Sequence, residues 1–116
     1  MTTSSDPTEF AVPELKYDDN GLIPAIVQDD ASHEILMLGY MNEQSVRMTL
    51  EKRLVTFWSR SRQEYWTKGE TSGNVLELVG IRKDCDVDAL LVRAVPHGPT
   101  CHTGNRSCFY RDLGDD

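Results

Sequence analysis

The order of hydrophobic and polar positions along the chain predicts short strands around a single helix. Two runs rich in Ile, Val, Leu and Met, at residues 22–28 and 35–41, flank a polar, turn-like stretch, and this is the pattern of a β-hairpin. Pro24 lies inside the first run and has no N–H group to donate. We therefore expect this strand to lie at a sheet edge or to be bulged rather than to be central.

A helix is expected directly after the hairpin, over residues 43–53. Its apolar side chains recur at four-residue spacing and therefore share one face: Val46, Leu50 and Leu54. Asn42 has the side chain to cap its N-terminus. Strand-like segments rich in β-branched, aromatic and leucine residues follow at residues 54–59, 75–81 and 87–95. The pattern predicts an α+β fold, with a small mixed or antiparallel sheet and one main helix packed on it.

The segments between the later strands, residues 60–74 and 96–107, are rich in Gly, Ser, Thr, Arg and His and are expected to be loops. Loops that carry such groups on a scaffold of strands are common sites of binding and catalysis. Residues 1–9 offer little to bury and predict a disordered tail. Because 116 residues suffice for one hydrophobic core, residues 10–116 are expected to form a single domain.

The net charge of −7 comes from an acidic first third of the chain. Residues 1–43 hold nine acidic side chains and one basic one, so the remainder is close to neutral. An acidic protein lacks the broad positive face that binds nucleic acid or anionic membranes, so neither partner is expected. Residues 1–10 have neither the basic nor the apolar region of a signal peptide, no apolar run approaches the ~18 residues that span a bilayer, and the three cysteines suit a reducing compartment. These features predict a cytoplasmic protein.

Three carboxylates alternate with other residues in one short segment: Asp84, Asp86 and Asp88. If the segment is extended, the carboxylates project to one face, and Cys85 projects to the other. A bound Mg²⁺, which prefers oxygen ligands, would relieve the repulsion among the carboxylates. A solvated acidic turn without a metal is the alternative.

Cys101 and Cys108 lie in a glycine-containing loop and can reach one metal ion, with Cys85 as a third thiolate. Three protein ligands leave a position for water, as in catalytic zinc sites. The alternatives are incidental thiols, or a structural zinc site that His97 or His102 closes. Because Cys85 faces away from its flanking acids, a site completed by Cys85 from a second subunit is plausible.

A third group of residues is basic and hydroxylic, and it is suited to phosphate. Arginine side chains and Gly/Ser/Thr loops both donate hydrogen bonds to phosphate oxygens. The candidates are Arg60, Arg62, Lys68, Thr71, Ser72 and Gly73. Aromatic residues among them, Trp58, Tyr65 and Trp66, offer faces for stacking on a purine. Residues 47–68 carry six bases and two acids, a local charge of +4. The alternative is a solvated basic loop beside core tryptophans.

At these residues the chain resembles the phosphoribosyl-AMP cyclohydrolases, over about residues 21–111. Six blocks carry the resemblance: Gly-Leu-Ile-Pro-Ala-Ile-Val-Gln-Asp (21–29), Tyr-Met-Asn (40–42), Phe-Trp-Ser-Arg-Ser-Arg (57–62), Trp-Thr-Lys-Gly-Glu-Thr-Ser-Gly-Asn (66–74), Asp-Cys-Asp-Val-Asp (84–88) and Cys-His-Thr-Gly-Asn-Arg-Ser-Cys-Phe (101–109). The chain departs from the family pattern at residues 38–39 and 96–97.

The resemblance implies a homodimer that depends on Zn²⁺ and Mg²⁺ and has active sites between its subunits. It implies Mg²⁺ at Asp84, Asp86 and Asp88, and Zn²⁺ in the C-terminal loop, at Cys101 and Cys108 with Cys85 from the partner chain. Bifunctional relatives continue into a phosphoribosyl-ATP pyrophosphohydrolase domain. Since this chain ends at residue 116, that second activity is expected to be absent.

The reaction implied is hydrolytic opening of the adenine ring of phosphoribosyl-AMP between N1 and C6, the third step of histidine biosynthesis. Its product is a formimino-type imidazole carboxamide ribonucleotide. His102, beside Cys101, is the expected general base, and the basic and hydroxylic residues would hold the two phosphates. A zinc-stabilised binding module and a zinc deaminase of free bases or nucleosides are the alternative functions. One deaminase class has a His-x-Glu and Pro-Cys-x-x-Cys signature that this chain lacks.

Overall fold

The computed structural model describes residues 15–114, so the predicted tail at residues 1–9 lies outside the described residues. Within that range the chain forms β1 (Ile23–Asp29), β2 (Ile35–Met41), α2 (Glu43–Lys52), β3 (Thr56–Ser59), β4 (Glu64–Thr67), β5 (Leu76–Lys83) and β6 (Leu90–Pro96). The α+β class, with a mixed sheet and one main helix, is confirmed over residues 15–114. Across the same residues, no helix combines the length and the apolar character needed to cross a bilayer.

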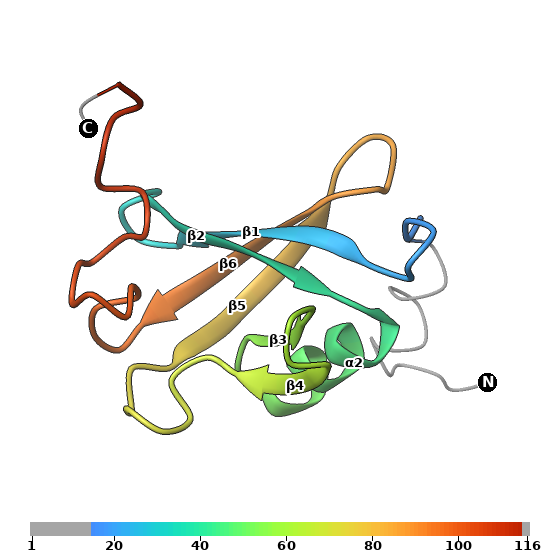
Figure 1. The fold of residues 1–116 in the computed structure, drawn as a ribbon, viewed down its shortest axis with the longest axis horizontal. Coiled ribbons are helices and arrows are strands. Elements are labelled where there is room, and N and C mark those ends of the chain that lie inside the picture. The colour runs from blue at the N-terminus through green and yellow to red at the C-terminus, as the bar shows by residue number, and fades with distance from the viewer. Residues whose placement is uncertain (1–14, 115–116) are drawn as a thin grey trace.

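Four strands form a mixed sheet in the order β2-β1-β6-β5, and α2 with the two-stranded β3–β4 sheet lies on one side of it (Figure 1). The hairpins β1–β2 and β5–β6 are antiparallel, and the parallel pairing of β1 with β6 joins them. Parallel strands end at the same edge of a sheet. The turn after β1 therefore lies beside the segment that follows β6, as the pairing of Asp29 with Ala94 shows.

The core lies between the sheet and the α2 layer. Alternate residues of β1 are fully buried, namely Ile23, Ala25 and Val27, and so are Val92 and Ala94 of β6. From the other layer, Val46 of α2 and Phe57 of β3 are each 1% exposed. Burial of this apolar surface is the main favourable term in folding, and it fixes which face of each strand points inward.

The helix begins as predicted and ends one residue early. Asn42 is the N-cap. Its side-chain oxygen accepts the Ser45 N–H at 2.9 Å, and the Ser45 hydroxyl accepts the Asn42 N–H at 2.8 Å. Arg53 adopts a left-handed φ of 62° and ends the helix. Leu54 consequently lies outside it and pairs with Glu77 instead of extending the apolar face.

The expectation that Pro24 marks an edge strand is wrong, because β1 lies between β2 and β6, although the pairing of β1 with β2 does shift its register, between Val27 and Gln28 rather than at Pro24. Pro24 pairs with Tyr40 of β2, but the register with β6 starts one residue later, at Ala25 and Leu90. At Pro24 itself, β1 thus has a neighbour on one side only. The missing N–H therefore costs no bond to β6.

Two further expectations need correction. Residues 64–67, predicted to be loop, form β4, in which Trp66 pairs with Phe57 and Tyr65 with Trp58. The strand predicted over residues 87–95 begins only at Leu90, because the preceding residues form the turn of the β5–β6 hairpin. Val87 in that turn has a φ of 55°, which an extended strand does not allow.

Gly39 allows β2 to pack closely on Phe57. A Cβ atom at Gly39 would lie 2.6 Å from two ring carbons of Phe57, whose side chain is fully buried. At Gly80 of β5 a Cβ atom would instead meet the terminal Nη2 of Arg93 at 2.7 Å, and a flexible arginine can move aside.

We expect Gly39→Ala to lower the free energy of unfolding by about 1–3 kcal/mol, since overpacking a filled core forces side chains and backbone to shift. Gly80→Ala is the matched control and should cost clearly less. Urea unfolding followed by tryptophan fluorescence measures both. Equal losses in the two variants would contradict the packing role of Gly39.

Candidate functional site

The loop after β6 brings Cys101 and Cys108 together. The two thiols are close enough for each to shift the pKa of the other. The loop is closed by backbone bonds from the Cys101 N–H to the Asn105 carbonyl at 3.0 Å and from the Gly104 N–H to the Cys101 carbonyl at 2.9 Å. The Cys108 N–H donates to the carbonyl of Leu36 at 2.7 Å, which attaches the loop to β2. Two sulfur ligands are thus available to one metal ion.

The surroundings of this pair favour a thiolate at Cys101. The Thr103 hydroxyl lies 3.0 Å from the Cys101 sulfur, and its hydrogen bond is the main cause that lowers the pKa of this thiol. The positive charge of Lys68 lowers the pKa further. Desolvation, and then the neighbouring Cys101, raise the pKa of Cys108. A zinc ion binds thiolates, so the donor set fits that metal.

Cys85 lies far from this pair within one chain. It is exposed in the turn of the β5–β6 hairpin, whereas the C-terminal loop lies at the other end of β6 (Figure 1). The seven residues of β6 span roughly 20 Å at ~3.3 Å per residue. The three cysteines are therefore not brought together in one subunit.

The three aspartates do meet, but through a turn rather than an extended segment. Their carboxylate oxygens lie within 4.8 Å of one another, in the set Asp84, Asp86 and Asp88. Asp84 Oδ1 accepts the N–H groups of Asp88 and Ala89 at 2.9 and 3.2 Å, which closes the turn. The expectation of two opposed faces on an extended strand is therefore wrong, although the oxygen cluster suits a hard cation such as Mg²⁺.

The negative charges of the three aspartates repel one another, and the pKa values of Asp84 and Asp88 shift in opposite directions. The hydrogen bond with Asp84, followed by desolvation and by the negative charges of Asp84 and Asp86, raises the pKa of Asp88. Desolvation would raise the pKa of Asp84 as well, but hydrogen bonds, first among them that from the Asp88 N–H, outweigh it and lower the pKa. A cation bound between them would favour the charged form of all three groups.

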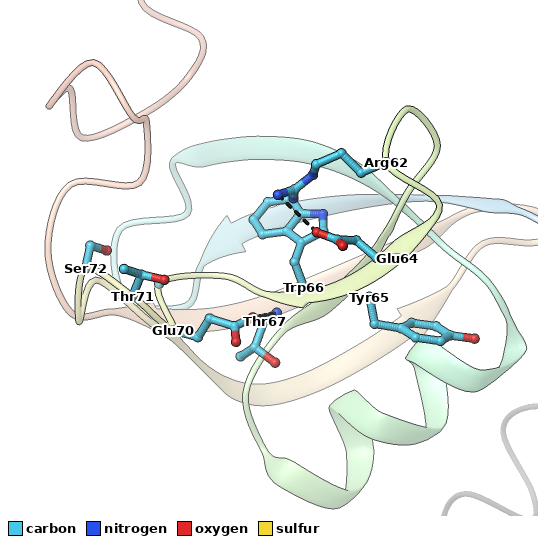
Figure 2. Close-up of a pocket in the computed structure, with 9 residues that line it drawn as sticks. Arg62, Glu64, Tyr65, Trp66, Thr67, Glu70, Thr71 and Ser72 are labelled. Atoms are coloured by element: carbon cyan, nitrogen blue, oxygen red, sulfur yellow. Dashed lines mark hydrogen bonds and ion pairs between the residues drawn. The ribbon is translucent and has the colours of Figure 1, made fainter.

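The basic and hydroxylic residues divide between two cavities. Arg62, Thr71 and Ser72 line a cavity of about 470 Å³ together with Trp66 (Figure 2). Arg62 is ion-paired with Glu64 at 3.2 Å in that cavity. Arg60 lines a second cavity of about 720 Å³, and its guanidinium stands 4.0 Å from the ring centre of Tyr40. Trp66 lines both cavities.

Lys68 and Gly73 have other positions. The positive charge of Lys68 lowers the pKa of both thiols. Gly73, with a φ of 87°, donates its N–H to the Gly69 carbonyl at 2.7 Å and closes the turn that carries Thr71 and Ser72. A left-handed φ of this kind favours glycine.

The two candidate histidines differ in their surroundings. His102 follows Cys101 in the turn that Gly104 closes, and it is exposed. His97 also has an exposed ring, but its Nε2 lies 2.9 Å from Glu77 Oε1 on β5. His102 is thus the histidine next to Cys101 in the chain, whereas the ring of His97 is bonded to Glu77.

Arg106 is a residue of this loop that sequence reasoning missed. It lies between the two cysteines, and its guanidinium forms ion pairs with Asp29 and Glu34, at the two ends of the β1–β2 turn. The Asp29 side chain is only 8% exposed, and Asp29 lies 77 residues from Arg106 in the sequence. The only local signal in the sequence is a single arginine in the cysteine loop, and it does not indicate which acidic residues pair with that arginine.

Comparison with known proteins gives a family match. The family model described as phosphoribosyl-AMP cyclohydrolase matches residues 37–110. A phosphoribosyl-AMP cyclohydrolase of Dinoroseobacter shibae is 55% identical over 107 residues, covering 92% of this chain and 90% of the relative. One of Ruegeria pomeroyi is 62% identical over 96 residues, covering 83% and 81%. The histidine biosynthesis bifunctional protein HisIE of Bacillus subtilis is 59% identical over 103 residues, which is 89% of this chain and 49% of that protein.

The Asp29 carboxylate generates a prediction about acid stability. Burial would raise its pKa, but hydrogen bonds from the Ala31 amide, Arg106 and Ser32 outweigh burial and hold the pKa below its ordinary value. A carboxyl whose pKa is lower in the folded chain stabilises the fold above its unfolded pKa of about 3.9, and this contribution is lost as the pH falls through the folded pKa.

We therefore expect Asp29→Asn to lower the free energy of unfolding by about 1.5–3 kcal/mol at pH 7, the range for hydrogen bonds to charged groups. The deficit should shrink as the pH falls below about 4, because the carboxyl of the wild-type chain becomes protonated first in the unfolded state and then, at lower pH, in the folded state. Urea unfolding across this pH range measures it. Glu64→Gln, which breaks the exposed pair with Arg62, is the control and should have little effect at any pH. A deficit in Asp29→Asn that is independent of pH would contradict the prediction.

Proposed function

Since the chain belongs to the phosphoribosyl-AMP cyclohydrolase family, an enzyme family of histidine biosynthesis, we propose that it opens the adenine ring of phosphoribosyl-AMP by zinc-dependent hydrolysis of the N1–C6 bond. The observation that carries the zinc dependence is the meeting of Cys101 and Cys108 in a loop that favours a thiolate at Cys101.

The zinc ligands of the proposal are Cys101, Cys108 and Cys85 of the partner subunit. When bound, zinc would be held by these three thiolates and would make a bound water acidic near neutral pH. In the reaction the water oxygen forms a bond to C6, the N1–C6 bond breaks, and its electron pair goes to N1. His102 takes the proton from the attacking water and returns it to the departing nitrogen.

Substrate binding is assigned to the residues around Trp66. Phosphate groups would be held by Arg60, Arg62, Lys68, Thr71, Ser72 and Gly73. Support comes from the cavity that Arg62, Thr71 and Ser72 share, in which the hydroxyls of Thr71 and Ser72 lie at one end and the Arg62 guanidinium lies beside Trp66 (Figure 2). Trp66, between two cavities, offers a face on which an adenine can stack. Lys68 adds positive charge next to the thiols, where a phosphorylated substrate would meet the metal.

Magnesium is assigned to Asp84, Asp86 and Asp88. Three carboxylates within 4.8 Å of one another repel, and a hard divalent cation is the ligand that removes this repulsion. In a dimer with shared sites, this cluster and the neighbouring Cys85 would enter the partner's active site together.

The homodimer itself is supported by two features. Within one chain Cys85 lies at the far end of β6 from the other thiols. The sheet face away from α2 also carries apolar side chains in register across three strands, namely Leu38, Ile26 and Leu91. Leu38 is 42% exposed and Val95 is 41% exposed. A second copy of the chain would cover this face.

Zinc removal tests the proposed chemistry. We expect chelation to abolish conversion of phosphoribosyl-AMP, followed by absorbance, and zinc to restore it. Cys101→Ser should lose turnover while the circular dichroism spectrum and the unfolding midpoint stay close to wild type. Activity that survives complete zinc removal would refute the mechanism, and unfolding of Cys101→Ser would instead favour a zinc-stabilised binding module.

Mixing of inactive subunits tests the shared site. Cys85→Ser and Cys101→Ser chains, unfolded and refolded together at equal amounts, should recover about a quarter of wild-type activity, because half of the dimers are mixed and each has one intact site of two. A mixture of Cys101→Ser with Cys108→Ser is the matched control and should recover nothing, since both sites of its mixed dimer lack a ligand. Failure of the first mixture to recover would show that Cys85 does not act across the interface.

A further inference from the structure

We propose that Arg106 is a positioning residue for the zinc ligand Cys108, acting through its ion pairs with the β1–β2 turn. The inference rests on the proposed zinc site. Arg106 stands two residues before Cys108, and its side chain leaves the loop to reach Asp29, Ser32 and Glu34.

The turn is a rigid anchor for this side chain. The Asp29 carboxylate is nearly buried and also accepts the Ala31 N–H at 2.9 Å. Backbone bonds from the Asp29 N–H to the Glu34 carbonyl, and from the His33 N–H to the Asp29 carbonyl, close the turn at 2.8 Å each. A buried carboxylate requires a partner, because an unpaired charge in this setting is strongly destabilising. Arg106 therefore has a fixed docking point rather than a mobile surface acid.

The two residues that follow Arg106, the second of which is the metal ligand Cys108, are also hydrogen bonded to β2. Ser107 donates its hydroxyl to the Ile35 carbonyl at 2.7 Å, and the Cys108 N–H donates to the Leu36 carbonyl at 2.7 Å. Residues 106–108 thus dock on the turn and β2 at three successive points. On the other side, the Thr100 N–H donates to the Arg106 carbonyl at 3.2 Å, which links this stretch to Cys101.

The Arg106 side chain is consequently the one ionic link, among the contacts described for residues 100–108, between the cysteine loop and the rest of the fold. Loss of the Arg106 side chain removes no sulfur ligand, but it removes one of the three points that hold residues 106–108 on the turn and β2. We expect the position of Cys108 relative to Cys101 to be less well fixed as a result. Groups that orient metal ligands without touching the metal typically contribute 10–100-fold to metal affinity. Removal of Arg106 leaves the Asp29 carboxylate with the Ala31 N–H but without its cationic partner, so we expect the variant to be less stable than wild type, and its zinc affinity is measured under conditions in which it is folded.

The experiment measures zinc affinity of the purified full chain by competition with a chromophoric chelator. We expect Arg106→Gln to raise the zinc Kd about 10–100-fold, and Arg106→Lys, which keeps the charge but not the fork, to fall between wild type and Arg106→Gln. Arg93→Gln is the matched control: it removes an ion pair of 3.3 Å with Asp30 of the same turn without touching the cysteine loop. Its zinc Kd should equal that of wild type.

A spectroscopic readout separates positioning from general destabilisation. In cobalt-loaded protein, the thiolate-to-cobalt absorption bands should weaken or shift in Arg106→Gln and stay unchanged in Arg93→Gln. Should Arg106→Gln fail to fold, Glu34→Gln removes one of the two carboxylate partners and should raise the Kd several-fold.

The same measurements distinguish the two failures. Wild-type zinc affinity and an unchanged cobalt spectrum in Arg106→Gln, or an unchanged Kd in Glu34→Gln if that variant has to be used, would overturn the role of Arg106 while leaving the zinc site standing. A wild-type chain that binds no zinc would overturn the proposed function, and the inference with it.

Discussion

Strand β6 holds the acidic turn and the cysteine loop at its two opposite ends, and this separation determines how the chain can use its metal-ligating residues. Because β6 is extended and lies between them, Cys85 is too far from Cys101 and Cys108 to bind the same metal ion in one subunit. The oxygen ligands and the sulfur pair form two separate groups in each chain. A site that uses both groups requires two chains in opposite orientation, which is the arrangement that a symmetric dimer provides.

The parallel pairing of β1 with β6 has the second large effect on the site. It brings the turn after β1 to the edge where the chain leaves β6 for the cysteine loop. Asp29 and Arg106, 77 residues apart in the sequence, meet there. The loop is therefore attached to the sheet by an ion pair and backbone hydrogen bonds, without needing a helix or strand of its own.

Much of the scaffold was predictable because its signals are local. The hairpin of residues 22–41 and the helix with its Asn42 cap follow from apolar spacing and capping chemistry within a few residues. Pro24 does not indicate the place of β1 in the sheet, because the neighbours of a strand are determined by tertiary pairing, and the pairing of β1 with β6 starts one residue after Pro24. Residues 64–67 were missed as a strand because the polar residues on both sides masked the Tyr-Trp-Thr run. The αL conformation of Val87, unusual for a β-branched residue, had no signal in the sequence.

The candidate site divides in the same way. The three aspartates and the pair of loop cysteines were predictable, since each group lies within a few residues of sequence and meets in the fold. The division of the basic residues between two cavities depends on β4, and the partner of Arg106 depends on the β1–β6 register; neither can be derived from spacing.

X-ray absorption at the zinc edge tests the shared metal site most directly, because it counts the sulfur atoms bound to the metal. With one zinc ion per chain, we expect three sulfur ligands at about 2.3 Å in the wild-type protein and two in Cys85→Ser. Two sulfur ligands in both proteins, or none in either, would contradict a site built from Cys101, Cys108 and the partner subunit's Cys85.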